Sequence, residues 1–216
     1  MLRIRCAVDN IIVIGGGGHA KVLISVLKKA GYQIEGYTDT EDKGLILGIR
    51  HLGNDGVLLD IARRQTAWKA IIGVGKIDAS DARLRLQDQI SALGFEIPAV
   101  RSPHSVVNEA VTLGAGTVVL DGVVVNSGTE IGRACILNTS STVEHDCRIG
   151  ENVHIAPGVT LSGGVTIGDH CMLGTGVNVM QSIKIYEGCL IGAGSTVVKD
   201  ITTPGTYAGN PAQRIR

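Results

Sequence analysis

One feature limits the possible folds of this chain more than any other: an uninterrupted six-residue repeat in its second half. Every sixth residue between Val107 and Val197 is aliphatic. A period this short and regular is typical of a solenoid, in which each repeat packs only against its neighbours. The complete series is Val107, Leu113, Val119, Val125, Ile131, Leu137, Val143, Ile149, Ile155, Leu161, Ile167, Leu173, Val179, Ile185, Ile191 and Val197.

The residues that follow these aliphatic positions predict where the chain bends. Glycine and asparagine tolerate positive φ, so we expect them to mark the corners between short flat strands. Three bends in each 18 residues describe a triangular prism, and sixteen hexads make 16/3, or about five, coils. One corner series holds Gly114, Gly132, Gly150 and Gly168, and a second holds Asn138, Gly174 and Gly192.

The cysteines follow the same register. Four of the five lie two residues before a repeat aliphatic, where serine, threonine or valine fills the other hexads. We therefore predict that they are small inward-facing packing residues, with no redox or zinc-binding role. These four are Cys135, Cys147, Cys171 and Cys189, whereas Cys6 stands apart and has no assigned role.

The first hundred residues show a different pattern, in which apolar runs alternate with helical periodicity. Such alternation predicts a small parallel sheet with helices, a βαβαβ unit about half the size of a complete dinucleotide domain. We expect this domain over residues 1–100 and the repeat domain over residues 101–216. The expected strands are 10–14, 33–38, 70–73 and 95–100, and the expected helices run from 18 to 30, from 57 to 64 and from 80 to 93.

Charge and hydropathy exclude some partners. Twenty basic and twenty acidic residues cancel, which offers no electrostatic case for nucleic acid or an anionic membrane. No apolar run approaches the roughly 20 residues that span a bilayer, and the N-terminus lacks a signal-peptide core. We therefore expect a cytoplasmic protein.

A glycine-rich loop follows the first expected strand and leads into the first expected helix. Residues 15–20 read G-x-G-x-x-A, and Asp39 follows about 20 residues later, as in the dinucleotide fingerprint. Glycines at a helix N-terminus let backbone N–H groups approach a phosphate. The loop therefore predicts a phosphate-binding site, although the motif alone is weak.

The second candidate site is a histidine between carboxylates in the repeat. His145 lies two residues beyond Val143, so we expect it on an outward-facing position of a flat side, and Asp146 is placed to hold its tautomer. Gly163 follows 18 residues later, so we expect it to stack one coil away on the same side. An imidazole, whose ordinary pKa is about 6.5, is suited to accept a proton at neutral pH. This arrangement suits the attack of an amine or hydroxyl on a thioester, which needs a base and an oxyanion donor but no metal.

These motifs resemble those of the hexapeptide acyltransferases, and among them the sugar acetyltransferases that modify nucleotide-linked amino sugars or sialic acids. The resemblance covers nearly the whole chain. It implies a small Rossmann-like N-terminal domain followed by a left-handed parallel β-helix, with acetyl-CoA bound in a groove between neighbouring β-helices of a homotrimer. The matching residues are Gly-Gly-His-Ala-Lys at 17–21, Asn138-Thr139-Ser140-Ser141, His145-Asp146 and Asn210-Pro211-Ala212.

The resemblance also implies residue roles. His145 would be the general base and Asp146 its orienting acid; the family more often has Glu at the latter place, so Glu144 remains a possible substitute. His154 lies half a coil from His145 and would act across a subunit boundary, whereas His51, His104 and His170 match nothing and are expected at the surface. The expected substrate-binding residues are Gly17, Gly18, His19, Asp39, Thr40, Gly73 and Asn138. The expected acetyl-CoA-binding residues are His154, Gly163, Gly174, Ala193 and Pro211, and no metal is expected.

The leading hypothesis is therefore acetyl transfer to the 4-amino group of a nucleotide-linked amino-dideoxy sugar, with UDP favoured as the nucleotide. Thr40 stands where the family often has a second acid, and this difference bears on which nucleobase the substrate carries. O-acetylation of a sialic acid is the alternative within the same class. A zinc hydratase on the same helix would need three converging histidines. An NAD-dependent oxidoreductase and a non-catalytic nucleotide-sensing scaffold also remain open.

Overall fold

The computed structural model describes residues 10–64 and 68–216 of the chain. Cys6 and the N-terminal segment on which the signal-peptide expectation depends lie outside the described residues. The described chain divides into two compact units, one with residues 10–75 and Leu86–Pro98 and the other with Lys76–Arg85 and Ala99–Arg216. Among the described residues, no helix has both the length and the apolar character that crossing a bilayer requires.

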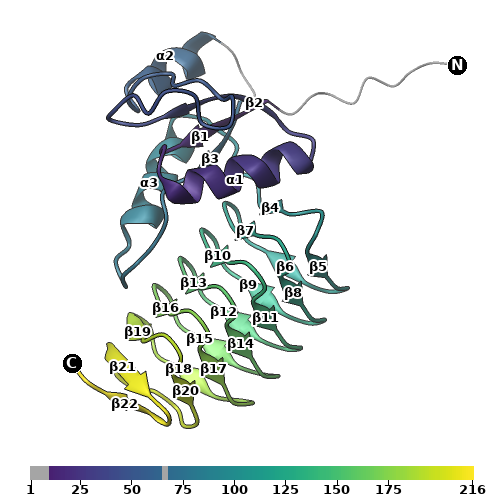
Figure 1. Cartoon of the computed structure of the whole chain (residues 1–216), viewed down its shortest axis with the longest axis vertical. Helices are drawn as coiled ribbons and strands as arrows, with labels where there is room; N and C mark the ends of the chain where they lie inside the picture. The colour runs from purple at the N-terminus through teal and green to yellow at the C-terminus, as the bar shows by residue number, and fades with distance from the viewer. Residues whose placement is uncertain (1–9, 65–67) are drawn as a thin grey trace, which may run out of the picture. The chain divides into compact units, whose positions relative to one another are not determined.

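The first unit is built on a parallel three-stranded sheet in the order β2-β1-β3. Its strands are β1 (Asn10–Ile14), β2 (Gln33–Thr38) and β3 (Lys69–Ile72), in the predicted places. Ile11 to Ile14 are fully buried, as expected for a central parallel strand covered on both faces. The helices are α1 (Gly18–Lys29), α2 (Val57–Arg64) and α3 (Ala82–Ala92) (Figure 1).

The predicted last strand of this unit, at 95–100, is wrong. Glu96 forms only an isolated parallel bridge with Lys69, so no fourth strand joins the sheet. Val100 and Arg101 instead form β4, which pairs with β7 in the repeat domain. The hexad pattern did not extend to this coil because the position one hexad before Val107 is the exposed residue Arg101.

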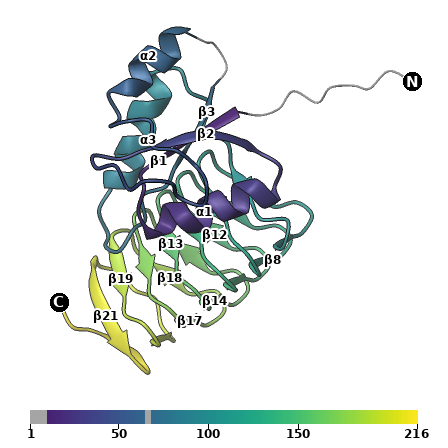
Figure 2. The same ribbon diagram turned by 45° about the horizontal axis from the view of Figure 1, so that its top comes forward.

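The second unit is a parallel β-helix with three flat sheets, as predicted (Figures 1 and 2). Paired residues lie 18 positions apart, for example Ile136 and His154. The first sheet contains β4 (Val100–Arg101), β7 (Val118–Val119), β10 (Ile136–Leu137), β13 (His154–Ile155), β16 (Met172–Leu173), β19 (Cys189–Ile191), β21 (Gly205–Gly209) and β22 (Ala212–Arg214). The second contains β5 (Val106–Val107), β8 (Val124–Val125), β11 (Thr142–Val143), β14 (Thr160–Leu161), β17 (Asn178–Val179) and β20 (Thr196–Val197). The third contains β6 (Thr112–Leu113), β9 (Glu130–Ile131), β12 (Arg148–Ile149), β15 (Thr166–Ile167) and β18 (Lys184–Ile185).

The core of this unit is a column of the repeat aliphatics and of the small residues two positions before them. From Val119 onward the aliphatics are buried, and Val107 and Leu113 of the first coils pack against them while partly exposed. The predicted inward-facing packing of the four cysteines is confirmed, since Cys135, Cys147, Cys171 and Cys189 are free and fully buried within this core. Burial raises the pKa of the Cys135 thiol to about 12, which makes it unreactive at neutral pH.

The corner glycines are required by close approach between coils, and not by positive φ as the sequence analysis expects. Gly132 and its equivalents do not have positive φ; that conformation belongs to the residue three positions after each repeat aliphatic from Val107 to Ile191. Gly132 is required because a Cβ there would lie 2.7 Å from the carbonyl carbon of Gly150 on the next coil. Between Val107 and Val197, the residues with positive φ are Ala110, Gly116, Gly122, Gly128, Ala134, Ser140, Asp146, Asn152, Gly158, Gly164, His170, Gly176, Ser182, Gly188 and Gly194.

This distinction predicts different changes in the free energy of unfolding for two glycine substitutions. Gly132→Ala pushes a methyl group against backbone that has no room to move, and overpacking of this kind costs about 1–3 kcal/mol. Gly176→Asn should cost little, because an added Cβ meets nothing within 4 Å and asparagine tolerates a φ of 69°. Urea unfolding of both variants measures the difference in the free energy of unfolding. Equal losses in the two variants would show that coil-to-coil approach does not decide the choice of glycine.

Candidate active site

His145 and Asp146 lie at the corner between the second and third sheets, where the chain passes from β11 to β12, and not on a flat side as the six-residue count predicts. Their side chains are in contact, with 2.8 Å between Nδ1 of His145 and Oδ2 of Asp146. A carboxylate only accepts hydrogen bonds, so the imidazole Nδ1–H is the donor and Nε2 carries the lone pair. Asp146 adopts φ 59°, a left-handed conformation that aspartate tolerates better than most residues. The corner thus orients an exposed imidazole, 64% of whose side chain is accessible, with its basic nitrogen away from the acid.

Gly163 lies against the ring of His145, as the 18-residue spacing predicts. A Cβ at this position would come within 2.7 Å of both Nε2 and Cε1 of the imidazole. The two coils are held in register by a 2.9 Å hydrogen bond from the Gly164 N–H to the His145 carbonyl. In the part of the chain that the structure describes, the Gly163 N–H has no hydrogen-bond partner. The absence of a side chain therefore leaves space beside Nε2 and a backbone donor next to it.

Glu144 does not take part in orienting His145. Its Oε2 accepts a 2.8 Å hydrogen bond from Nδ2 of Asn126, whose own Oδ1 accepts a 2.7 Å bond from Nδ2 of Asn108. These three polar residues form a ladder across successive coils, each 18 positions from the next. An 18-residue count in the sequence finds this ladder, but Asn108 and Asn126 were not among the expected site residues. The contact with His145 is made by Asp146, so the alternative orienting residue has no support in the geometry.

Asn138 and His154 form a second cluster, on the first sheet. The Asn138 Nδ2 lies 3.2 Å from the His154 Nε2, and the His154 Nδ1 lies 2.6 Å from the carbonyl oxygen of Lys76. His154 is only 9% exposed, and burial lowers the pKa of its imidazole. His145 and His154 occupy different sheets, as their half-coil separation predicts. Asn138 accordingly contacts His154 and not His145.

The other residues expected to bind acetyl-CoA are spread over different parts of the β-helix. Gly174 and Ala193 stack on successive coils at the corner between the first and second sheets, where a Cβ on Gly174 would lie 2.7 Å from the Ala193 nitrogen. Pro211 lies in the turn of the antiparallel β21–β22 hairpin. None of these residues shares a corner with His145 and Gly163. Within one chain, the expected acetyl-CoA residues therefore fall into separate groups.

Two described grooves in the second unit both lie on the third sheet. One has a volume of about 600 Å³ and is lined in part by Thr166, Lys184 and Tyr186. The other, of about 390 Å³, includes Glu130 and Arg148. Neither is lined by His145, Gly163 or His154. Among the described residues, no group of three or more His, Cys, Asp and Glu side chains is arranged to hold a metal ion.

In the first unit, the glycine loop connects β1 with the N-terminus of α1. Gly16 is sterically required, since a Cβ would lie 2.7 Å from the ring of Tyr37. Gly17 and Gly18 are different, because an added Cβ at either would meet nothing within 4 Å. Glycine at these two places therefore leaves the start of α1, which carries the His19 side chain, accessible from outside. Gly73, at the end of β3, is packed closely against Val13 and Ala20.

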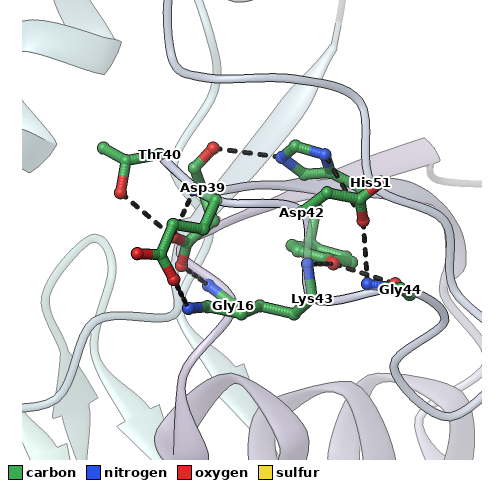
Figure 3. A network of polar contacts seen from close by, with 9 residues as sticks. Gly16, Asp39, Thr40, Asp42, Lys43, Gly44 and His51 are labelled. Carbon is green, nitrogen blue, oxygen red and sulfur yellow. Dashed lines mark hydrogen bonds and ion pairs between the residues drawn. The ribbon is translucent and has the colours of Figure 1, made fainter.

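Asp39 is the centre of a polar network at the end of β2 (Figure 3). Its Oδ2 accepts a 2.8 Å hydrogen bond from the Gly16 N–H, and its Oδ1 accepts bonds from the Glu41 N–H and the Thr40 hydroxyl. The hydrogen bond from the Glu41 backbone, with help from Gly16 and the charge of Lys43, lowers the pKa of Asp39. The carboxylate thus ties the glycine loop to the segment after β2, and Gly16 is a site residue that the sequence analysis did not single out.

His51 also belongs to this network, so the expectation that it is a surface residue is wrong. Only 16% of its side chain is exposed, its ring packs 5.2 Å from that of Tyr37, and its Nε2 lies 3.0 Å from the Asp39 carbonyl oxygen. No spacing in the sequence connects His51 with Asp39. The segment between β2 and α2, which brings them together, has no regular periodicity from which to predict the contact.

The lowered pKa of Asp39 predicts a pH-dependent effect of Asp39→Asn. Because the folded-state pKa lies below the ordinary value of 3.8, the ionised carboxylate contributes stability above that pH. This contribution is lost as the pH falls through the folded-state pKa. We expect Asp39→Asn to unfold at lower urea concentration than the unmodified chain at pH 7, with the difference disappearing towards pH 2. A difference that stays constant over this range would contradict a role for the ionised form.

Comparisons with known proteins match both units. Residues 10–90 match the PglD N-terminal domain, residues 128–163 match the bacterial transferase hexapeptide (six repeats), and residues 164–199 match the hexapeptide repeat of succinyl-transferase. Among curated proteins, the GDP-perosamine N-acetyltransferase of Escherichia coli O157:H7 is 37% identical over 76 residues. That stretch is 35% of this chain and 34% of the relative.

Two solved structures match nearly the whole chain. A variant of the perosamine N-acetyltransferase of Caulobacter crescentus, solved with CoA and GDP-perosamine, is 32% identical with a TM-score of 0.90. The match covers 96% of this chain and 97% of that one. The acetyltransferase domain of PglB from Neisseria gonorrhoeae FA1090, solved with acetyl coenzyme A, is also 32% identical with a TM-score of 0.90. Here the match covers 97% of this chain and 100% of the other.

Proposed function

Because the chain belongs to the family of hexapeptide-repeat sugar acetyltransferases that carry a PglD N-terminal domain, we propose that it acetylates the 4-amino group of a nucleotide-linked amino-dideoxy sugar. Acetyl-CoA is the donor. The observation that carries the proposal is the arrangement of His145, oriented by Asp146 at 2.8 Å, with the open backbone of Gly163 beside its Nε2. This geometry provides a base and an oxyanion donor next to the same space.

In the proposed reaction, His145 removes a proton from the sugar amine as the nitrogen attacks the thioester carbonyl. The C–N bond forms, the C–S bond breaks, and CoA leaves as a thiolate. The proton goes to Nε2, and the imidazolium that results is stabilised by the Asp146 carboxylate on Nδ1. The Gly163 N–H is placed to donate to the carbonyl oxygen as negative charge develops there. Both groups are part of adjacent coils, so the β-helix holds them in place before substrate binds.

The nucleotide-sugar half of the proposal assigns the first unit to phosphate and sugar recognition. Gly17 and Gly18 leave the N-terminus of α1 uncovered, which suits the approach of a pyrophosphate to backbone N–H groups. His19 follows them in the first turn, and Asp39 and Thr40 border the same loop through Gly16. Gly73, at the carboxyl end of β3, lies at the edge where parallel sheets bind ligands.

The nucleotide is the part of the substrate that differs between the candidates. The named sugar nucleotide in two of the relatives is GDP-perosamine, whereas the sequence analysis favours UDP. We therefore propose to measure kcat/KM with acetyl-CoA and the GDP-, UDP- and dTDP-linked 4-amino sugars, with product identified by mass spectrometry. Free and CMP-linked sialic acids serve as the O-acetylation alternative. Acetylation of sialic acid without acetylation of any amino sugar would overturn the proposal.

A homotrimer is the expected assembly. The residues expected to bind acetyl-CoA fall on one sheet, on two different corners and in the β21–β22 turn of one chain, which supports a groove completed by a neighbouring copy. Light scattering coupled to size exclusion should give a mass three times that of the 22.5 kDa chain. A fully active monomer would contradict sites shared between subunits.

A further inference from the structure

Gly128 lies one coil before Asp146, at the same corner between the second and third sheets, where the chain passes from β8 to β9. A Cβ at Gly128 would lie 2.7 Å from Oδ1 of Asp146, which is closer than such atoms approach in folded proteins. The other oxygen of that carboxylate, Oδ2, lies 2.8 Å from Nδ1 of His145. The carboxylate that orients the imidazole therefore occupies space that a side chain at Gly128 would fill.

The backbone of Asp146 is tied to the coil that contains Gly128. The Asp146 N–H donates a 3.1 Å hydrogen bond to the Ser127 carbonyl, and the Cys147 N–H donates a 3.2 Å bond to Oγ1 of Thr129. These bonds lie on either side of Gly128, so the backbone of Asp146 has little freedom to move away. A side chain at Gly128 would have to be accommodated by rotation of the Asp146 carboxylate. Because the two carboxylate oxygens move together, that rotation also takes Oδ2 away from the imidazole.

The backbone conformation by itself does not require glycine at this position. Gly128 adopts φ 76°, a left-handed conformation that glycine adopts most easily. The equivalent position of two other hexads nevertheless carries alanine, since Ala110 and Ala134 have φ 58° and 57°. This β-helix thus accepts a methyl group three residues after a repeat aliphatic. At Gly128 the methyl group would displace the carboxylate of Asp146.

We propose that Gly128 is a positioning residue, which by carrying no side chain leaves Asp146 in the orientation that holds the Nδ1–H of His145. Which imidazole nitrogen carries the hydrogen is set by the hydrogen bond that the ring makes. Without the contact to Asp146, Nε2 carries the hydrogen in part of the molecules and cannot accept a proton from the amine. This inference rests on the proposed function, in which His145 is the base, and it acts within a single corner of the β-helix.

Steady-state kinetics of Gly128→Ala provide the first test. We expect kcat to fall about tenfold to a hundredfold, as for loss of one hydrogen bond to a charged group, with KM for both substrates within about threefold. Gly188→Ala is the matched control, because Gly188 has φ 67° and an added Cβ would meet its nearest atom at 3.8 Å. The control should keep the kcat of the unmodified chain. Equal losses of kcat in the two variants, or no loss in Gly128→Ala, would overturn the proposal.

A double-mutant cycle tests whether Gly128 acts through Asp146. Asp146→Ala removes the carboxylate that the new methyl group would displace, so adding Gly128→Ala to it should lower kcat by less than about twofold. Residues that act independently would instead give losses that multiply. Multiplied losses in the double variant would therefore contradict a role that passes through Asp146.

Nitrogen-15 NMR of the ligand-free protein, labelled at histidine, provides a test that does not depend on activity. At about pH 9, where an imidazole is ordinarily neutral, the nitrogen shifts distinguish the two tautomers, and the signals of His145 are those absent from His145→Ala. The unmodified chain and Gly188→Ala should show hydrogen on Nδ1, whereas Gly128→Ala should show a mixture. An unchanged tautomer in Gly128→Ala would overturn the proposal. If the unmodified chain acetylates no amino sugar, the proposed function fails while the tautomer still reports on Gly128, so the two failures are distinguishable.

Discussion

Replacing His145 with alanine is expected to lower kcat by about a hundredfold or more, with KM for both substrates within about threefold of the unmodified value. The reason is the orientation of the ring. Nδ1–H is engaged by Asp146, so Nε2 is the nitrogen that takes the proton, and alanine removes it without altering the corner that Asp146 and Gly163 form. The side chain is largely exposed and contributes little packing, so the fold should be retained.

The measurement is steady-state kinetics with acetyl-CoA and the amino sugar that proves to be the substrate. His104→Ala is the matched control, since it removes an exposed imidazole from the same β-helix. Added imidazole should restore part of the activity of His145→Ala. It should not change the activity of the His104→Ala control. Turnover of His145→Ala close to that of the unmodified chain would exclude His145 as the base.

Gly163→Ala is expected to have the second-largest effect. The new methyl group would lie 2.7 Å from Nε2 of His145, so the imidazole must move, and the space in front of the Gly163 N–H is filled. A displacement of about 1 Å in a catalytic group can cost about a hundredfold in rate. Because the ring is exposed and can rotate away, the free energy of unfolding should change little.

Comparison with Gly132→Ala separates catalysis from folding. Both substitutions add one methyl group to a glycine of the β-helix, but in Gly132→Ala it meets backbone of the next coil and in Gly163→Ala the end of a side chain. We expect the first variant to lose stability and the second to lose kcat, as measured by urea unfolding and by kinetics on the same preparations. A Gly163→Ala protein with full activity would show that neither the ring position nor the glycine N–H matters for the reaction.

The parts of this molecule that could be predicted from the sequence are those with a period. The hexads place the strands of the β-helix from Val106 to Val197, bury the cysteines at Cys135 and Cys147, and bring Gly163 to the ring of His145 by an 18-residue count. Such positions follow from counting because each coil repeats the last. The same 18-residue count also relates Asn108, Asn126 and Glu144, whose side chains form the hydrogen-bonded ladder.

Interactions without a period were predicted poorly. The coil that begins at Val100 was missed because Arg101 stands where an aliphatic residue is expected, and its strand is stabilised by pairing with β7. His51 was placed at the surface because nothing in its neighbourhood indicates that it lies next to Tyr37 and Asp39. The corner glycines were identified correctly but for the wrong reason, since close approach between coils, and not backbone φ, excludes a side chain at Gly132.

The sequence by itself therefore determined the β-helix, the stacking of Gly163 on His145 and the separation of His154 from them, because these depend on a repeat that is local in the chain. Only the tertiary structure decided which carboxylate holds His145 and what His154 bonds to. Asp146 and Glu144 are both adjacent to His145 in sequence, and the direction of each side chain depends on the corner conformation and on Asn126 one coil away. The hydrogen bond between His154 and Lys76 joins residues 78 positions apart, and no periodic pattern in this sequence predicts which residues pair at that separation.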